Sequence, residues 1–384
     1  MTMIFQETPR QEQKTATATM RALVFRGPHQ IGIERVRIPK AGPGEAVIRV
    51  TLTTICGTDL HILRGEYAVK PGLIIGHEPV GIIHELGVGV MGYKIGERVL
   101  AGAITPCGQC NYCLGGDWSQ CGGAIGGWKF GNTINGAQAE YLLVPNAQAN
   151  LAKIPDDLCD EQVVLLADIA STGISAAESA DLQIGDTVAI FAQGPIGLCA
   201  TAGARLKGAG LIIAVESDAV RAQMAKRMGA DYILNFKETD VISEIKRLTD
   251  GKGVDVAIEA VGVPASFDIC QNIVRPGGHV AVIGVHGHSV DLQLQKLWIQ
   301  NIVLTTGLVS TNTTPMLLKN VSSGKLEPKK LITHHFRLDD ILEAYNVFTN
   351  AAEKNALKVI IESEGAGMLK TGVEEKKEEL AGRA

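Results

Sequence analysis

Four cysteines lie close together in the chain, at a spacing that suits a metal ion. They are Cys107, Cys110, Cys113 and Cys121. Gaps of two residues between the first three let one loop wrap around an ion, and four thiolates complete a tetrahedral shell with no open position. The pattern predicts a structural zinc site, with an iron–sulfur cluster or reversible disulfides as the alternatives.

A second group of side chains that can bind metal is dispersed over the first half of the chain. Its members are Cys56, with Thr58, Asp59 and His61 after it, then His77 with Glu78, and Asp168. Each has an ordinary explanation on its own, because a lone cysteine is usually a small core residue and a lone histidine or aspartate usually bonds the backbone. Their recurrence ahead of a dinucleotide-binding pattern calls for a joint interpretation.

That pattern is Ala192-Gln-Gly-Pro-Ile-Gly197, which follows a predicted strand and begins a predicted helix. Gly194 and Gly197 let the backbone approach a pyrophosphate, whose charge faces the free amides of the helix N-terminus. Pro195 and Ile196 lie between them and are further candidate coenzyme contacts. Ala192 stands where the fingerprint has its first glycine, and an ordinary turn is the alternative. The position between strand and helix favours dinucleotide binding.

Glu216 ends the next predicted strand, 19 residues after Gly197. A carboxylate there can accept hydrogen bonds from the adenosine ribose hydroxyls, and it would repel a 2′-phosphate, so the sequence favours NAD over NADP. Ser217 and Asp218 already offer capping groups to the following helix, which argues against a purely capping role for Glu216. Arg221, one turn into that helix, is the residue that could instead pair with a phosphate.

Two kinds of structure must position these side chains. Short runs rich in Val, Ile and Thr, broken by Gly and Pro, predict a mostly β region up to about residue 170. After it, six strand-like runs alternate with helical patterns, which predicts a doubly wound parallel sheet in an α/β fold. The expected order is a disordered leader 1–20, a catalytic domain with the cysteine lobe 21–172, a dinucleotide-binding domain 173–310, a return to the catalytic domain 311–361 and a charged tail 362–384.

Composition excludes several classes of function. The 384 residues carry a formal net charge of −5, and the dispersed Lys and Arg form no basic stripe for nucleic acid and no patch for a membrane. No apolar run reaches the roughly 18 residues that span a bilayer, and the N-terminus lacks the order of a secretory signal. Four of the eight cysteines crowd into one lobe, so we expect reduced thiols and a cytoplasmic protein.

Taken in order, these motifs resemble the zinc-containing medium-chain alcohol dehydrogenases, and especially the bacterial secondary alcohol dehydrogenase branch. The resemblance covers about residues 20–361 and includes Gly127-Trp-Lys-Phe-Gly-Asn132. It implies a Rossmann sheet beside a mostly β, GroES-like catalytic domain, NAD as coenzyme, and two zinc ions per chain, one catalytic and one structural. It also implies a homotetramer, with a homodimer as the alternative.

By this resemblance Cys56, His77 and Asp168 hold the catalytic zinc and leave its fourth position for water or the substrate oxygen. Many relatives have a cysteine where this chain has Asp168, and aspartate is typical of the secondary alcohol branch. Glu78 is similar to a residue that enters the coordination sphere during ligand exchange. Asp59 is similar to the carboxylate that orients the histidine ligand.

The resemblance implies that zinc lowers the pKa of the bound alcohol, that a hydride passes to NAD, and that Thr58 and His61 relay the proton to solvent. Thr172 would hydrogen-bond the nicotinamide carboxamide. The residues expected to line an apolar substrate pocket are Ala103, Ile104 and Trp128.

The expected reaction interconverts a small alcohol, in particular a secondary one, with a ketone or aldehyde. Some secondary alcohol dehydrogenases lack the cysteine lobe, so a polyol, sugar or formaldehyde dehydrogenase of the same architecture is an alternative. A catalytically silent dinucleotide-binding protein with oxidant-responsive thiols is another. His286 and His288 follow a predicted strand and are interpreted as loop residues, although they could approach the coenzyme.

Overall fold

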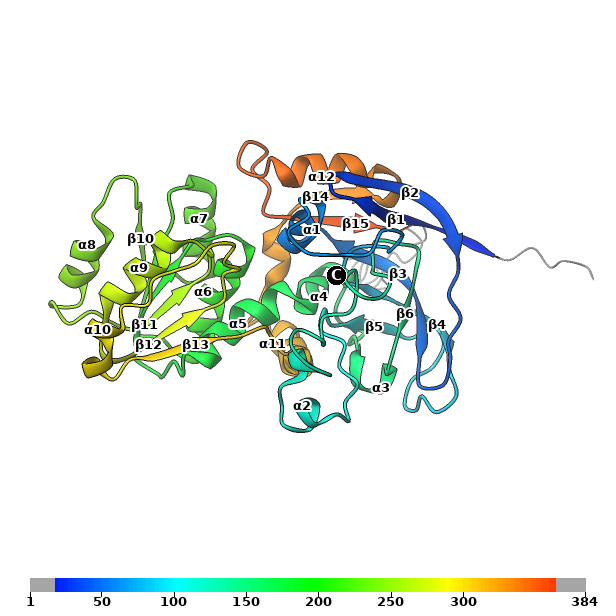
Figure 1. The fold of residues 1–384 in the computed structure, drawn as a ribbon, viewed down its shortest axis with the longest axis horizontal. Helices are drawn as coiled ribbons and strands as arrows, with labels where there is room; N and C mark the ends of the chain where they lie inside the picture. The colour runs from blue at the N-terminus through cyan, green and yellow to red at the C-terminus, as the bar shows by residue number, and fades with distance from the viewer. Residues whose placement is uncertain (1–17, 364–384) are drawn as a thin grey trace, which may run out of the picture.

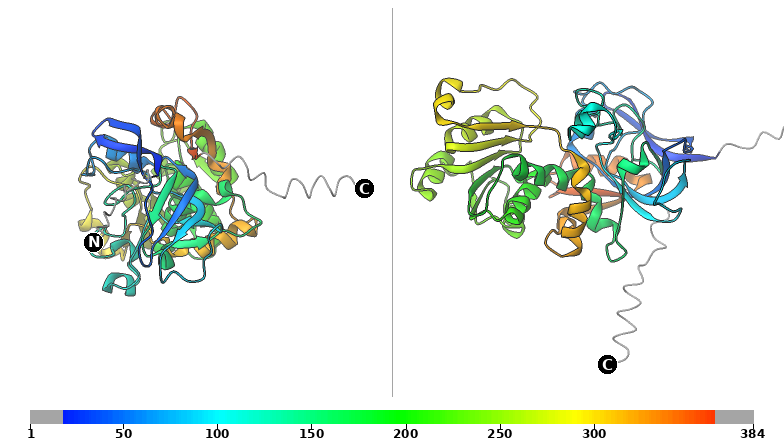
Figure 2. Two further views of the ribbon diagram at one scale, coloured as in Figure 1. Left: turned by 90° about the vertical axis from the view of Figure 1, so that its right-hand side faces the viewer. Right: turned by 90° about the horizontal axis from the view of Figure 1, so that it is seen from below.

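The computed structural model describes residues 18–363, and the chain within them forms two lobes. In Figure 1 the central part of the chain, green to yellow, makes one lobe, and both the N-terminal part and the orange C-terminal part make the other. The lobes also stand apart in the view from below (Figure 2). Most of the predicted leader 1–20 and of the predicted tail 362–384 lies outside the described residues. The inner bounds of both predictions were wrong, because Thr19 and Met20 already belong to the first strand and Glu362 ends the last one.

The first lobe is a six-stranded parallel sheet in the order β10-β9-β8-β11-β12-β13. Its strands are β8 (Thr187–Phe191), β9 (Leu211–Val215), β10 (Tyr232–Leu234), β11 (Val254–Glu259), β12 (Val274–Val282) and β13 (Val303–Thr306). Its helices are α6 (Pro195–Lys207), α7 (Ala219–Met228), α8 (Val241–Leu248), α9 (Pro264–Ile273) and α10 (Leu294–Leu297). The strand order reverses beside β8, which opens a crevice at the carboxyl ends of the strands. The predicted doubly wound sheet is confirmed.

The second lobe is a mostly β domain. Its seven-stranded sheet runs β14-β15-β3-β4-β5-β7 with β6 paired to β3, and β1 and β2 form a separate hairpin. The strands are β1 (Thr19–Gly27), β2 (Gln30–Arg37), β3 (Ala46–Thr54), β4 (Val80–Leu86), β5 (Arg98–Ala101), β6 (Tyr141–Val144), β7 (Leu151–Lys153), β14 (Ile332–Arg337) and β15 (Lys358–Glu362). β3 is almost wholly buried, because neighbouring strands and helices cover both of its faces.

Short helices connect these strands. They are α1 (Gly57–Leu63), α2 (Asn111–Leu114), α3 (Ala147–Asn150), α4 (Asp160–Val163), α5 (Ile169–Ser179), α11 (Thr314–Ser322) and α12 (Ile341–Thr349). Single 3-10 turns occur at η1 (Trp118–Gln120), η2 (Val164–Ala167), η3 (Trp298–Gln300), η4 (Thr311–Thr313), η5 (Pro328–Leu331) and η6 (Leu338–Asp340). None of the helices between residues 18 and 363 has both the length and the apolarity that crossing a bilayer requires.

The C-terminal part of the chain returns to the mostly β lobe, where β15 pairs antiparallel with β3. Strand β14, which pairs parallel with β15, was not predicted. It lies at the edge of the sheet, and its side chains alternate between half-buried and exposed. An edge strand of this kind can carry polar residues on its open face, so its sequence lacks a strong apolar signal.

A continuous apolar core joins the two lobes through η2 and α5. It extends from Leu52 and Val80 in the mostly β sheet to Val188 in the parallel sheet. Helices α5 and α6 cross closely at Gly173, where an added Cβ would lie 2.5 Å from the Cβ of Cys199. The absence of a side chain at this position is therefore what lets the two helices meet.

We expect Gly173→Ala to destabilise the fold by about 1–3 kcal/mol, because the new methyl group would overlap backbone atoms of α6 that cannot move aside. The measurement is the denaturant midpoint, monitored by circular dichroism. Gly32→Ala is the matched control, since a Cβ there meets nothing within 4 Å. Equal midpoints for the two variants would show that the helices have room to separate.

Candidate metal centres and dinucleotide cleft

Four side chains from three segments converge at the junction of the two lobes. The ligand atoms of Cys56, His77, Glu78 and Asp168 all lie within 4.8 Å of one another. Cys56 precedes the first turn of α1, His77 and Glu78 stand just before β4, and Asp168 precedes α5. The Oδ2 atom of Asp168 is 3.5 Å from Cys56 Sγ and 3.4 Å from His77 Nε2.

The chemistry of this donor set fits a zinc ion. A thiolate, an imidazole and a carboxylate are the ligand types of zinc sites that keep an open position. Burial raises the pKa of the Cys56 thiol, so the thiolate needs a nearby cation. Glu78 adds a second buried carboxylate, whose Oε2 atom has no hydrogen-bond partner. An unpaired anionic oxygen in the interior is costly, and a cation at this point would relieve the cost.

A network of hydrogen bonds behind these residues fixes their positions. Asp59 Oδ2 accepts a hydrogen bond from the Cys56 backbone N–H at 2.9 Å, and Oδ1 lies 3.6 Å from His77 Nδ1. Gln138, which the sequence analysis did not identify, donates to Asp59 Oδ2 at 3.3 Å and accepts from the Tyr345 hydroxyl at 2.8 Å. Asp59 therefore lies beside His77, and its role in orienting that imidazole stays a prediction.

Lys358 is the second residue that the sequence analysis missed. Its ammonium group lies 2.6 Å from Glu78 Oε1, and both side chains are 1% exposed. Nζ also donates to the backbone carbonyl of Ile55 at 3.0 Å. Burial lowers the pKa of Lys358, but Glu78, Cys56 and Asp168 together outweigh burial and raise that pKa above its usual value. A lysine inside the apolar strand β15 was the available signal, because a charge is rarely buried without a partner.

Thr172 lies beside the same cluster. Its hydroxyl donates a hydrogen bond of 2.9 Å to Asp168 Oδ1. Burial raises the pKa of Asp168, but His77, Lys358 and Thr172 together outweigh burial and keep that pKa below its usual value. In this structure Thr172 therefore holds a candidate ligand, and its contact with a carboxamide stays a prediction.

The predicted relay residues lie beside the cluster, in the wall of the cleft. Thr58 and His61 line a cavity of about 360 Å³ together with Cys56. His61 Nδ1 is hydrogen-bonded to a carboxylate oxygen of Glu66. The ring centroid of Tyr67, another residue that the sequence analysis did not identify, lies 6.0 Å from that of His61.

The predicted pocket residues are buried. Trp128 is 8% exposed, and its ring packs edge-on against Tyr67 at 5.3 Å and His77 at 6.3 Å. Ile104 forms an isolated β-bridge with Trp128, and the Ala103 backbone N–H donates to the carbonyl of Ala167 at 2.9 Å. Aromatic rings thus form an apolar wall beside the candidate metal centre.

The second candidate metal centre is the cysteine lobe. The Sγ atoms of Cys107, Cys110, Cys113 and Cys121 lie within 4.8 Å of one another, and none is in a disulfide. Backbone N–H groups point at the sulfurs: that of Cys110 donates to Cys107 Sγ at 3.3 Å, and that of Cys107 to Cys121 Sγ at 3.2 Å. Hydrogen bonds from the backbone of the lobe lower the pKa of Cys110 to about 6. Four sulfurs held in this way fit a structural zinc ion.

The fingerprint turn lies across the cavity from Cys56. Gly194, Pro195, Ile196 and Gly197 line it, with Gly194 preceding the first turn of α6. A Cβ at Gly197 would stand 1.9 Å from the carbonyl oxygen of Ala192, so only glycine fits this turn. Ala192 itself has a φ of +64°, the left-handed conformation that glycine adopts most easily. The departure from the fingerprint therefore leaves the turn intact.

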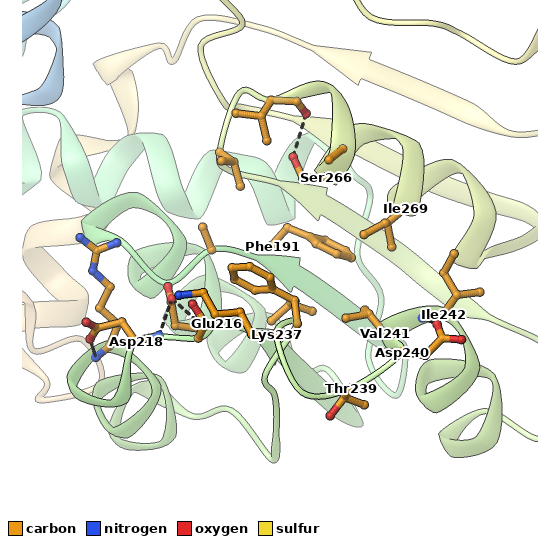
Figure 3. A pocket seen from close by; sticks show the side chains of 18 of the residues that line it. Phe191, Glu216, Asp218, Lys237, Thr239, Asp240, Val241, Ile242, Ser266 and Ile269 are labelled. Atoms are coloured by element: carbon orange, nitrogen blue, oxygen red, sulfur yellow. Dashed lines mark hydrogen bonds between the residues drawn. The ribbon is translucent and has the colours of Figure 1, made fainter. Parts of the chain in front are cut away.

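A larger cavity of about 760 Å³ continues past the fingerprint, and Figure 3 shows it from close by. Glu216, Arg221 and Lys237 are among the residues that line it. Glu216 is 6% exposed and accepts hydrogen bonds from the backbone N–H groups of Gln193, Ser217 and Asp218, at 2.8–2.9 Å. Asp218 caps α7, as the sequence analysis anticipated when it assigned capping to residues other than Glu216.

The two cavities share Ala192, Arg221 and Val261 among their lining residues, so they form one cleft from the parallel sheet to the candidate metal centre at Cys56. A cleft of this kind between a Rossmann sheet and a buried set of zinc-type ligands defines a class of protein, the two-domain dinucleotide-dependent oxidoreductases.

Comparison with known proteins narrows this class. The family model for a zinc-binding dehydrogenase matches residues 195–323, and that for an alcohol dehydrogenase GroES-like domain matches residues 42–156. An alcohol dehydrogenase of Cupriavidus necator is 47% identical over 363 residues, covering 90% of this chain and 99% of the relative. The NADP-dependent isopropanol dehydrogenase of Thermoanaerobacter brockii is 36% identical over 330 residues, covering 84% and 94%.

Among solved structures, the apo form of zinc dependent alcohol dehydrogenase 2 from Streptococcus pneumonia matches with a TM-score of 0.84 and 45% identity, covering 90% of this chain and 99% of that one. The chain belongs to the zinc-dependent medium-chain alcohol dehydrogenases. The family predicted from the sequence motifs is thereby confirmed.

We expect Lys358→Met to destabilise the protein by about 3–5 kcal/mol, because it leaves the buried Glu78 carboxylate without its partner. The double variant Glu78→Gln, Lys358→Met should recover much of that loss. Denaturant unfolding of the wild type, the two single variants and the double variant measures the coupling free energy between Glu78 and Lys358. Lys153→Met is the control, since that lysine pairs with Glu97 at the surface. A Lys358→Met midpoint no lower than that of the control would contradict the buried pair.

Proposed function

We propose that this chain is a zinc-dependent, NAD-linked dehydrogenase of small secondary alcohols, and that Cys56, His77 and Asp168 hold its catalytic zinc. The observation that carries the proposal is the convergence of these three side chains at the end of the dinucleotide cleft. A zinc ion there would lower the pKa of the alcohol hydroxyl and, in the reverse direction, polarise the ketone carbonyl.

The chain's own residues move the proton. Thr58 Oγ1 lies 3.7 Å from Cys56 Sγ, at the edge of the cluster, where it can accept a proton from the alcohol. His61 takes the proton next: Glu66 occupies its Nδ1, so Nε2 is the nitrogen left to exchange it. Trp128 and Tyr67 cover the cluster with apolar surface and exclude water from it.

Three observations support secondary alcohols as substrates. The third candidate ligand is the aspartate Asp168, which the sequence analysis associated with the secondary alcohol branch. Relatives named isopropanol dehydrogenases cover most of this chain. The apolar wall of Trp128 and Ile104 suits short aliphatic groups better than the many hydroxyls of a polyol or sugar.

The test pairs metal analysis with activity. We expect two zinc ions per chain and reduction of NAD by 2-propanol that is lost when one zinc is chelated. Cys113→Ser should lose the structural zinc and keep catalytic zinc, while His77→Ala should lose the catalytic zinc and all turnover. Cys159→Ser, outside both clusters, is the control. A single zinc, together with no oxidation of any alcohol on a panel, would leave the silent dinucleotide-binding alternative.

We further propose NAD as the preferred coenzyme. Glu216 places a carboxylate in the larger cavity, where it would repel a 2′-phosphate, and this outweighs the positive charge that Arg221 and Lys237 bring to the same cavity. Three backbone N–H groups hold Glu216 in place, whereas the two cations lie on longer, more flexible side chains.

Glu216→Gln should therefore lower the ratio of kcat/KM for NAD to that for NADP by about tenfold, because it removes the repulsion and weakens the ribose contact. Initial rates with each coenzyme at saturating 2-propanol measure it. Glu238→Gln, exposed and close by in the sequence, should leave the ratio unchanged. A wild-type protein that already favours NADP would contradict the assignment.

We propose that the protein is a cytoplasmic homo-oligomer, a tetramer or a dimer. All eight cysteines are free of disulfides, which supports a reducing compartment. Strand β13 is an edge strand, and apolar side chains beside it are open to solvent: Trp298 is 71% and Ile299 68% exposed. An exposed apolar edge favours association with another copy of the chain.

Ile299→Glu should lower the molar mass in solution, because a charge would be buried in that contact. Light scattering coupled to size exclusion measures it. Leu342→Glu, on α12 of the other lobe and 49% exposed, should leave the mass unchanged. A monomeric wild-type protein would overturn the proposed assembly.

A further inference from the structure

A second buried carboxylate stands in the parallel sheet, at the carboxyl end of β11. Glu259 is fully buried and is aligned with Phe191 on β8 and Val282 on β12. Its Oε1 atom accepts hydrogen bonds from the backbone N–H groups of Val261 and Gly262, both at 2.9 Å. The carboxylate thus holds the turn that follows its own strand.

Two side chains complete its surroundings. Ser266 Oγ donates to Oε1 at 2.6 Å, and His286 Nε2 lies 3.1 Å from Oε2. His286 Nδ1 is buried without a hydrogen-bond partner, so a proton there would be an unsatisfied donor. The geometry suits a ring that donates to Glu259 Oε2 through Nε2.

Hydrogen-bond donors surround the Glu259 carboxylate. Its partners are all donors, which suits an ionised carboxylate, and no lysine or arginine in the part of the chain that the structure describes forms an ion pair with it. The pKa of the neighbouring Cys270 thiol is raised, first by burial and then by the Glu259 carboxylate.

The loops that Glu259 joins form one wall of the cavity that contains Cys56. The lining residues from them are Ala260, Val261, Ile283, Gly284 and Val285. The two loops pack closely at Gly284, because a Cβ there would lie 2.2 Å from the Gly262 nitrogen and 2.4 Å from Glu259 Oε2. The backbone carbonyl of Glu259 also accepts from Gly284 N–H at 3.1 Å.

We infer that Glu259, held by His286, is a positioning residue for the nicotinamide end of the cleft and favours the oxidised coenzyme over the reduced one. The inference rests on the proposed function, in which the hydride-exchanging ring must lie at the Cys56 end, against this wall. Only the oxidised ring carries a positive charge, and a buried negative charge close to it stabilises that form selectively.

The test measures the dissociation constants of the oxidised and the reduced coenzyme separately, by calorimetry in the absence of alcohol. The coenzyme used, NAD or NADP, is the one that the wild-type protein binds. Glu259→Gln should raise the ratio of the oxidised to the reduced constant by about 5- to 20-fold. Glu259→Asp keeps the charge on a shorter arm, so both constants should rise with the ratio near wild type. An unchanged ratio in folded Glu259→Gln overturns the inference.

A second variant tests whether His286 positions the Glu259 carboxylate. His286→Phe removes one donor to the carboxylate and should weaken binding of both forms by about 3- to 10-fold. His288→Phe, on an exposed residue of the same loop, is the matched control and should bind as wild type. If Glu259→Gln does not fold, wild-type constants in folded His286→Phe overturn the inference. If the wild-type protein binds neither the oxidised nor the reduced coenzyme, the proposed function itself is contradicted.

Discussion

Charged side chains are buried where the two lobes meet, and the arrangement of the molecule follows from the need to compensate them. Lys358 and Glu78 are both 1% exposed and 2.6 Å apart, beside Cys56, His77 and Asp168. Each charge would be prohibitively costly alone in this interior. The chain compensates these charges by bringing the C-terminal strand β15 back against β3. The Lys358 ammonium group donates a hydrogen bond to the backbone carbonyl of Ile55, although more than three hundred residues separate the two.

The apolar core fixes where that compensation occurs. It passes without a break through η2 and α5, so that Asp168, at the start of α5, is anchored to both lobes. Gly173 lets α5 lie against α6, the helix that begins at the fingerprint turn. One candidate zinc ligand, Asp168, and the fingerprint turn are therefore positioned by the same packed helix pair, and a shift of α5 would disturb both.

In the parallel sheet, a buried glutamate that binds backbone N–H groups occurs at the ends of two strands. Strands β9 and β11 lie on either side of β8, and a glutamate stands at the carboxyl end of each, Glu216 and Glu259. Each carboxylate collects backbone N–H groups that no strand partner satisfies, which fixes the turn after its strand. One negative charge faces the larger cavity and the other lies behind the wall of the smaller one. The parallel sheet thus orders its loops and sets the electrostatic field of the cleft with the same groups.

The sequence by itself determined the family, the alternating sheet and the residue types of both candidate metal centres, because those features depend on local spacing and periodicity. It also placed Cys56, His77 and Asp168 in one site, but only through resemblance to a family. Tertiary structure decided the partners: Gln138 and Tyr345 behind Asp59, Lys358 on Glu78, Thr172 on Asp168, and His286 on Glu259. Strand β14 was missed for a related reason, since an edge strand is defined by the neighbour it pairs with. Contacts between residues distant in sequence leave no local pattern, and they arise only when the core brings their strands together.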